Sequence, residues 1–227
     1  MNIHSQDIQL HYDIRHTLEP NRYASNFPTF NVEYFTSIDT LRTGYFLLKS
    51  QADLNGLNNN ISQVFTQIAQ SLKFWQPNLY LYFNYTGGLN VSASSYGYYI
   101  ANAYGIGIYY PFHWLGTNFT TYIVYQYTAN AKSSYDPELS LYFWKGTFHY
   151  RLIVTGSFTI WTVNKNQDNN FMENLQGKKF EIIGDPQIWL KIIKRFYIGS
   201  RINVYFNLID NLNQLEFYPT MGVKYAF

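Results

Sequence analysis

Residues that could perform catalysis or bind a metal are few in this 227-residue chain, which has no cysteine and five histidines. His11 and Asp13 stand two residues apart, so on an extended strand they share a face and can form a histidine–carboxylate contact. Arg15 follows on the same parity. No Gly-x-Ser-x-Gly motif supplies a nucleophile, and the histidines lack the spacing of metal ligands. We therefore interpret these three residues as a charge cluster, and we expect neither enzymatic activity nor a cofactor.

The elements that must position these residues show a two-residue period. In the segment 217–227, Phe217, Met221, Val223 and Tyr225 share one parity, whereas Lys224 lies on the other. A strict period of two predicts a β-strand whose two sides face different surroundings. The same alternation recurs at residues 8–15, 79–86, 180–192 and 198–208, which indicates an all-β protein.

Composition helps to decide whether the apolar side of these strands faces lipid, as in a membrane barrel, or a protein core, as in a soluble sandwich. Charged residues make up 13% of the chain, against about 25% in an ordinary soluble domain, and no Asp, Glu, Lys or Arg occurs between Lys73 and Lys132. Polar residues interrupt every apolar run, so no segment is long enough for a transmembrane helix. A transmembrane antiparallel up-and-down β-barrel fits both facts, because its apolar side chains face lipid and its polar side chains face the lumen. A soluble β-sandwich is the alternative.

Turn-forming residues between the alternating runs predict about twelve strands, joined alternately by short turns and longer loops. An even number of strands places both chain ends on the short-turn side. We expect residues 1–6 to be an N-terminal tail or a signal remnant, and residues 7–227 to form one outer-membrane barrel domain. One expected turn is Lys145-Gly146-Thr147. The strands are predicted near 7–16, 29–37, 43–53, 61–74, 79–89, 98–110, 119–129, 137–145, 148–162, 178–192, 196–209 and 215–227.

The polar parity of these strands predicts the lining of the lumen. Twelve strands lie between the eight that enclose a side-chain-filled interior and the sixteen that leave an open channel, so we expect a narrow lumen. Its rings could stack on a flat polar solute, or its opposite charges could pair and close the barrel. We expect the narrowest zone at Trp161, Asp185, Trp189, Arg201 and Tyr205. The full predicted lining is His11, Asp13, Arg15, Glu33, Lys49, Trp161, Glu181, Asp185, Trp189, Lys191, Arg201, Tyr205 and Lys224.

Four short motifs resemble a bacterial outer-membrane family of the domain-of-unknown-function class. They are IQLHYD at 8–13, FNVEYF at 30–35, SLKFW at 71–75 and YTGGL at 85–89. That family is similar to the Tsx-type nucleoside-specific channels, which are twelve-stranded barrels. The resemblance implies a location in the outer membrane of a Gram-negative bacterium and, less directly, passage of nucleosides. This chain is shorter than the Tsx type and poorer in acidic residues, so no binding residue is carried over.

These observations predict a channel for passive diffusion of small polar solutes, with nucleosides as candidates. The alternative is a closed barrel that serves as a structural or accessory subunit of an outer-membrane assembly. The expected partners are outer-membrane lipid and a small polar solute, and protein partners stay open. A formal net charge of +2, spread along the chain, does not indicate a nucleic acid polymer as a partner.

Overall fold

A computed structural model describes residues 3–37, 43–56, 60–75, 78–91, 97–129, 133–164, 177–208 and 213–227. Within these ranges the chain forms thirteen β-strands and one single-turn helix, α1 (Arg15–Leu18). No helix of this described part is long and apolar enough to cross a membrane. The strands are β1 (Ile3–Asp13), β2 (Phe27–Ser37), β3 (Thr43–Asp53), β4 (Gln63–Trp75), β5 (Leu79–Val91), β6 (Gly97–Trp114), β7 (Thr117–Thr128), β8 (Ser134–Thr147), β9 (Leu152–Asn164), β10 (Lys178–Gly184), β11 (Gln187–Ile193), β12 (Phe196–Phe206) and β13 (Leu215–Ala226).

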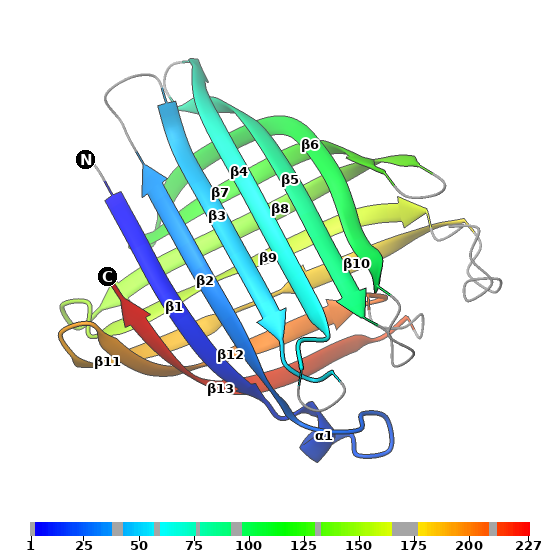
Figure 1. Cartoon of the computed structure of the whole chain (residues 1–227). Coiled ribbons are helices and arrows are strands. Elements are labelled where there is room, and N and C mark those ends of the chain that lie inside the picture. Colours follow the sequence, from blue (N-terminus) through cyan, green and yellow to red (C-terminus); the bar gives the residue numbers. More distant parts are fainter. Residues whose placement is uncertain are drawn as a thin grey trace.

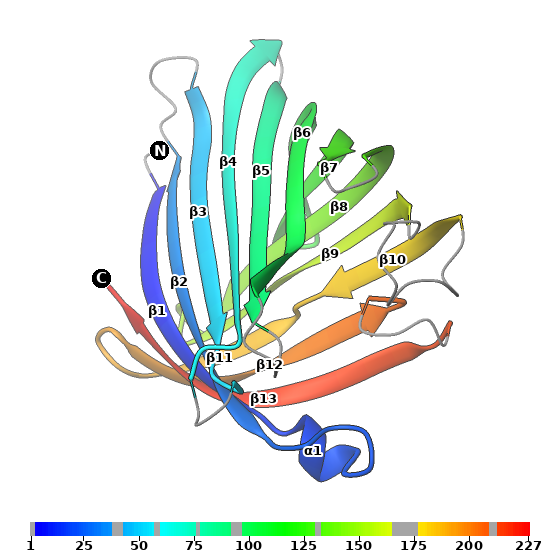
Figure 2. The same ribbon diagram turned by 45° about the vertical axis from the view of Figure 1, so that its right-hand side comes forward.

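The strands form one closed antiparallel sheet. Apart from β10 and β11, consecutive strands pair with each other, and β13 pairs with β1 to close the barrel (Figure 1). Strands β10 and β11 each pair with both β9 and β12, so they are two halves of one strand. Figure 2 shows β1 to β6 forming one wall and β8 to β13 the wall facing it. The predicted all-β barrel of about twelve strands is therefore confirmed.

The barrel has two ends of different character. At the turn end lie the chain ends and the short connections β4–β5, β6–β7, β8–β9 and β11–β12. At the loop end lie the longer connections, the first of which contains α1 (Figure 1). Both chain ends lie at the turn end, as predicted, because Asp7 pairs with Ala226.

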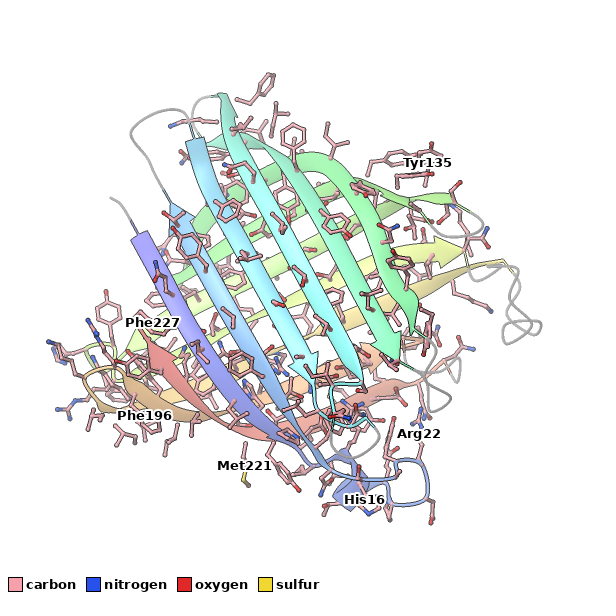
Figure 3. All side chains as sticks on the ribbon, viewed as in Figure 1. His16, Arg22, Tyr135, Phe196, Met221 and Phe227 are labelled. Carbon is pink, nitrogen blue, oxygen red and sulfur yellow. The ribbon has the colours of Figure 1, made fainter. Side chains whose placement is uncertain are left out.

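The alternation of side chains follows the predicted parity. On β13, Lys224 and Thr220 are buried, whereas Val223, Tyr225 and Met221 are exposed. Met221 and Tyr135 point away from the barrel wall (Figure 3). The outer surface is accordingly apolar and aromatic, as a lipid-facing barrel surface is. Its exposed residues include Leu10, Tyr12, Ile68, Phe83, Tyr104, Ile106, Ile123, Tyr125, Leu139, Ile160, Ile188, Ile198 and Phe217.

The break between β10 and β11 lies at Asp185-Pro186. Backbone hydrogen bonds to the neighbouring strands β9 and β12 continue across it. The Asp185 amide donates to the Ser157 carbonyl at 3.0 Å, and the Pro186 carbonyl accepts from the Ile202 amide at 2.9 Å. Opposite it, Gly156 has φ +156°, and a Cβ there would stand 2.6 Å from the Pro186 Cα. Pro186 has no backbone N–H to donate to a neighbouring strand, and Gly156 has no side chain that would collide with the Pro186 backbone. Together the two residues allow the break between β10 and β11.

Strand ends differ from the prediction by a few residues in several places, and three differences change how residues named above are read. Strand β1 begins at Ile3, so residues 3–6, expected as a tail, extend the first strand. Arg15 lies in α1 and not on a strand. The turn expected at Lys145-Gly146-Thr147 lies instead at residues 148–151, because Gly146 stays in register with Ile153. Gly146 does not bend the chain but makes room: a Cβ there would stand 2.3 Å from the Tyr150 ring.

Candidate functional site

The barrel encloses a cavity of about 660 Å³, which we call the vestibule. At the turn end it is lined by residues beside the short connections, among them Asn78, Phe112 and Ile153. Its deep end lies at the level of Lys49 and Asp185, near the middle of the barrel. None of its lining residues comes from the loop end of the described strands. The vestibule therefore reaches from the turn end to about mid-height.

Tyrosine rings form one side of the vestibule. The ring centroids of Tyr82 and Tyr122 are 4.8 Å apart, those of Tyr45 and Tyr109 are 5.0 Å apart, and those of Tyr109 and Tyr122 are 5.4 Å apart. Tyr45 lies on β3 and Tyr122 on β7, strands that are not neighbours, so these rings meet across the lumen. The small inward residue Ala69 packs in the same cluster. Centroid distances of about 4.5–7 Å are those of favourable ring contacts.

Two polar bridges cross the lumen at the deep end of the vestibule. The Lys49 ammonium on β3 contacts the Asp185 carboxylate at 2.8 Å. Asp185 also accepts from the amide and the hydroxyl of Ser157, each at 2.7 Å. The second bridge starts on β12, where buried Arg201 donates to Asn31 at 3.3 Å and to Gln51 at 3.2 Å. Both bridges connect strands that are not neighbours, so they narrow the lumen.

A third group of contacts, besides the tyrosine rings and the two bridges, surrounds Trp189, which has no exposed surface. The His11 ring packs edge-on against the Trp189 indole at a centroid distance of 5.4 Å. The Lys224 ammonium lies 4.8 Å from the Trp189 ring, a cation–π distance. The His11 nitrogens lie 2.9 Å from the Thr220 hydroxyl and 2.9 Å from the Gln9 side-chain oxygen. The histidine–carboxylate contact with Asp13 that the spacing allowed is not formed.

Asp13 instead belongs to an anchor at the loop end. Its two carboxylate oxygens accept from the Arg15 guanidinium at 3.0 and 2.8 Å. That guanidinium also lies 4.9 Å from the Phe27 ring and 4.9 Å from the Tyr218 ring. Arg22, which Figure 3 labels in the connection after α1, forms an ion pair with Glu216 on β13. The charge cluster predicted around Asp13 and Arg15 therefore ties the first loop to the barrel rim.

The other predicted lining residues are spread along the barrel. Glu33 lines the vestibule, and Lys191 lies on β11 with its ammonium 6.0 Å from the Tyr197 ring. Trp161 and Glu181 are register partners near the loop end, and Tyr205 lies there too, on β12. The residues of the predicted narrow zone are not brought together: Asp185 and Arg201 form the two bridges and Trp189 packs against His11, whereas Trp161 and Tyr205 lie towards the loop end. In the described ranges no three His, Asp or Glu side chains are grouped to hold a metal ion.

The predicted lining missed several residues that shape the lumen, notably Tyr45, Tyr109 and Glu138. The parity signal would have found them: Tyr45 shares the parity of Lys49, and Tyr109 opposes exposed Ile106 and Ile108. What the sequence does not reveal is which inward residues meet, because that depends on how the two walls face each other.

Comparisons with known proteins agree with the barrel fold. A family model described as a domain of unknown function (DUF5020) matches residues 5–227. Among solved structures, the chain is similar to the NanC porin, with 10% identity, a TM-score of 0.53 and 98% of each chain covered. It is also similar to a loop L8 deletion mutant of OmpT, an outer membrane protein of Vibrio cholerae, with 5% identity, a TM-score of 0.47 and coverage of 100% and 99%. A search of the curated proteins found no match.

Proposed function

Because the chain belongs to the family described as a domain of unknown function (DUF5020), we propose its function from the geometry of the lumen. The protein is a channel of the Gram-negative outer membrane for passive diffusion of small polar solutes. The location is supported by the apolar outer surface and by exposed aromatic residues at both ends, such as Trp114 at the turn end and Tyr135 at the loop end. The NanC porin has a similar fold.

The vestibule is the observation that carries this proposal. A barrel that serves only as a scaffold has no need of a cavity of about 660 Å³, a size within the roughly 300–1,000 Å³ typical of small-molecule sites. Its lining combines tyrosine faces with amides such as Gln67 and charges such as Glu33. Rings stack on flat solutes and contribute about 1–3 kcal/mol per nucleobase. Nucleosides are therefore candidate solutes. The resemblance to Tsx-type channels points the same way and stays a prediction.

The deep end of the vestibule makes the proposed path narrow. The Lys49–Asp185 and Arg201–Asn31 contacts cross the lumen, so a solute must pass beside them or displace them. We expect small single-channel steps for this reason. The proposal includes no catalytic step. The Thr220 hydroxyl lies 2.9 Å from the His11 ring, but both side chains have no exposed surface, and this hydroxyl also donates to the Arg201 carbonyl.

Planar-bilayer recording of the purified barrel tests the proposal. We expect discrete conductance steps, and adenosine added at the turn-end side should block them at millimolar or lower concentration. Arabinose, a polar solute without an aromatic ring, is the matched control and should block less. A barrel that is folded by circular dichroism but gives no steps contradicts the channel function.

A second candidate function is favoured by the same two bridges. If they close the lumen permanently, the barrel is a structural or accessory subunit of an outer-membrane assembly. Lys49→Ala separates the two candidates, because it removes one bridge without adding bulk. Larger conductance steps in this variant than in wild type support the channel, whereas two silent folded proteins support the closed barrel.

A further inference from the structure

Not all the inward carboxyl groups near the deep end of the vestibule are held in ion pairs within the described part of the chain. Glu33 lines the vestibule on β2, between Asp7 and Lys49 in the sheet register. In the described part of the chain its carboxylate has neither a hydrogen bond nor an ion pair. Glu138 lies on β8, two residues further inward than vestibule-lining Ser140 and on the same face of the strand. It accepts from the Ser140 hydroxyl at 3.3 Å, and no lysine or arginine of the described residues lies within 4.0 Å of it.

The cations of the vestibule, by contrast, already have partners. The Lys49 ammonium lies 2.8 Å from Asp185, and Ser157 holds Asp185 in place. The Lys224 ammonium lies 4.8 Å from the Trp189 ring and 5.2 Å from the Tyr197 ring. A cation held over aromatic faces is stabilised there and is less available to a solute. Among the described residues, the Arg201 guanidinium contacts only the amides of Asn31 and Gln51, but Arg201 is 2% exposed and does not line the vestibule. Among the described side chains that line or border the vestibule, those without an ion pair or a ring partner therefore include the carboxyl groups of Glu33 and Glu138.

The rings around these carboxylates suit a cation as well. Tyr45, Tyr82, Tyr109, Tyr122 and Tyr142 all line the vestibule. A ring face attracts a cation that lies within about 6 Å of its centroid, and the attraction is strongest for a weakly hydrated organic cation. Tyr45 is 3% exposed, and its hydroxyl has no hydrogen-bond partner among the residues the structure describes. That hydroxyl can accept a hydrogen bond from a donor that enters the cavity.

We infer that the deep end of the vestibule binds small organic cations, solutes that carry an ammonium or guanidinium group, and that it makes the channel cation-selective. The positive group lies among the tyrosine rings and donates to Glu33. This inference rests on the proposed channel function and specifies its solute class. A neutral nucleoside uses the rings but not the carboxylates. An anion is repelled by Glu33 and Glu138, and the lysines that would attract it are occupied.

Reversal potentials in a KCl gradient across a planar bilayer test the selectivity. We expect potassium to permeate better than chloride, because a charged cleft with low-dielectric walls raises the local counter-ion concentration about tenfold or more. Glu33→Gln should remove most of this preference while it preserves the size of the side chain. Glu19→Gln is the matched control, since it makes the same change at a half-buried carboxylate that pairs with Arg22 in the first loop and does not line the vestibule. A wild-type channel that prefers chloride, or a Glu33→Gln variant as selective as Glu19→Gln, overturns the inference.

Block by two small organic ions of opposite charge, each with an ethyl group, tests the binding site. Ethylammonium added at the turn-end side should block the current, propionate should not, and Glu33→Gln should weaken the block several-fold. Calorimetric titration of the folded barrel in detergent with ethylammonium gives a readout that needs no conductance. If the barrel does not conduct but binds ethylammonium through Glu33, the channel function fails and the cation site stands. If it conducts but wild type and Glu33→Gln bind ethylammonium equally, the cation site fails and the channel stands.

Discussion

Two sectors of the lumen differ in how their inward side chains fill the barrel. In the sector of β1, β2 and β11 to β13, which we call the polar sector, side chains such as His11, Trp189 and Arg201 are buried against one another. In the sector of β5 to β9, which we call the tyrosine sector, rings such as Tyr109 and Tyr142 border the open vestibule. Strand β3 contributes to both, with Gln51 in the first and Tyr45 in the second.

The difference follows from what each kind of side chain needs. A buried charge or amide is costly unless it has a partner, so the polar sector must be densely connected. Asp13, for example, is held by Arg15 and Asn203 at once. A tyrosine ring gains from contact with a few neighbours and tolerates empty or wet space along its face. The polar sector therefore contributes rigidity, and the tyrosine sector leaves the space that a solute can enter.

Removal of one large ring from each sector should give the largest contrast. Trp189→Ala deletes a fully buried side chain and should lower the free energy of unfolding by about 3–5 kcal/mol. Tyr142→Ala removes a ring that borders the vestibule, so it should cost less stability and increase the single-channel conductance. Urea unfolding of the barrel in detergent and bilayer recording measure the two effects. If Trp189→Ala increases the single-channel conductance as much as Tyr142→Ala does, the two sectors do not differ in the way described.

Loss of the bridge between the sectors should have the next largest effect. Asp185→Asn removes the charge that holds Lys49 while it keeps the shape of the side chain, and hydrogen bonds to charged groups contribute about 1.5–3 kcal/mol. We expect a stability loss in that range together with a larger conductance. The double variant Lys49→Met with Asp185→Asn should recover part of the stability, because neither member of this pair is left as a buried unpaired charge. Additive losses in the double variant, measured by urea unfolding, would mean that the two side chains are not coupled.

Removal of a single tyrosine hydroxyl from each sector should have the smallest effect on stability. It is the most direct comparison, because the same group is deleted in both sectors. Tyr218→Phe loses the contact between the Tyr218 and Tyr23 hydroxyls, which are 2.8 Å apart, and should cost about 1 kcal/mol of unfolding free energy. Tyr45→Phe removes a hydroxyl that has no partner in the described chain, and stability should change by no more than about 0.5 kcal/mol. If both variants lose the same unfolding free energy in thermal or urea unfolding, the Tyr45 hydroxyl must have a hydrogen-bond partner in the solute-free barrel.

The sequence predicted the sheet well where the signal was local. The turn between β11 and β12, at Lys194 and Arg195, was recognised from its residues, but glycine misled at Gly146, where it makes room for the Tyr150 ring within a continuous strand. The strand predicted over 178–192 is present but broken at Pro186, and only its pairing with β9 and β12 shows that the two pieces form one strand. The helix α1 carries no apolar periodicity, and its contacts with the barrel rim hold it in place.

What the sequence by itself determined is the side of the wall on which each strand residue lies. Alternation has a period of two, and a lipid-facing residue differs in polarity from an inward one, so Val223 and Lys224 could be assigned without a structure. Which inward residues meet was decided by the closed barrel alone. Lys49 and Asp185 lie 136 positions apart, and Arg201 and Asn31 lie 170 apart. Their heights and directions depend on the tilt and stagger of all the strands together, and these are set only when the last strand pairs with the first.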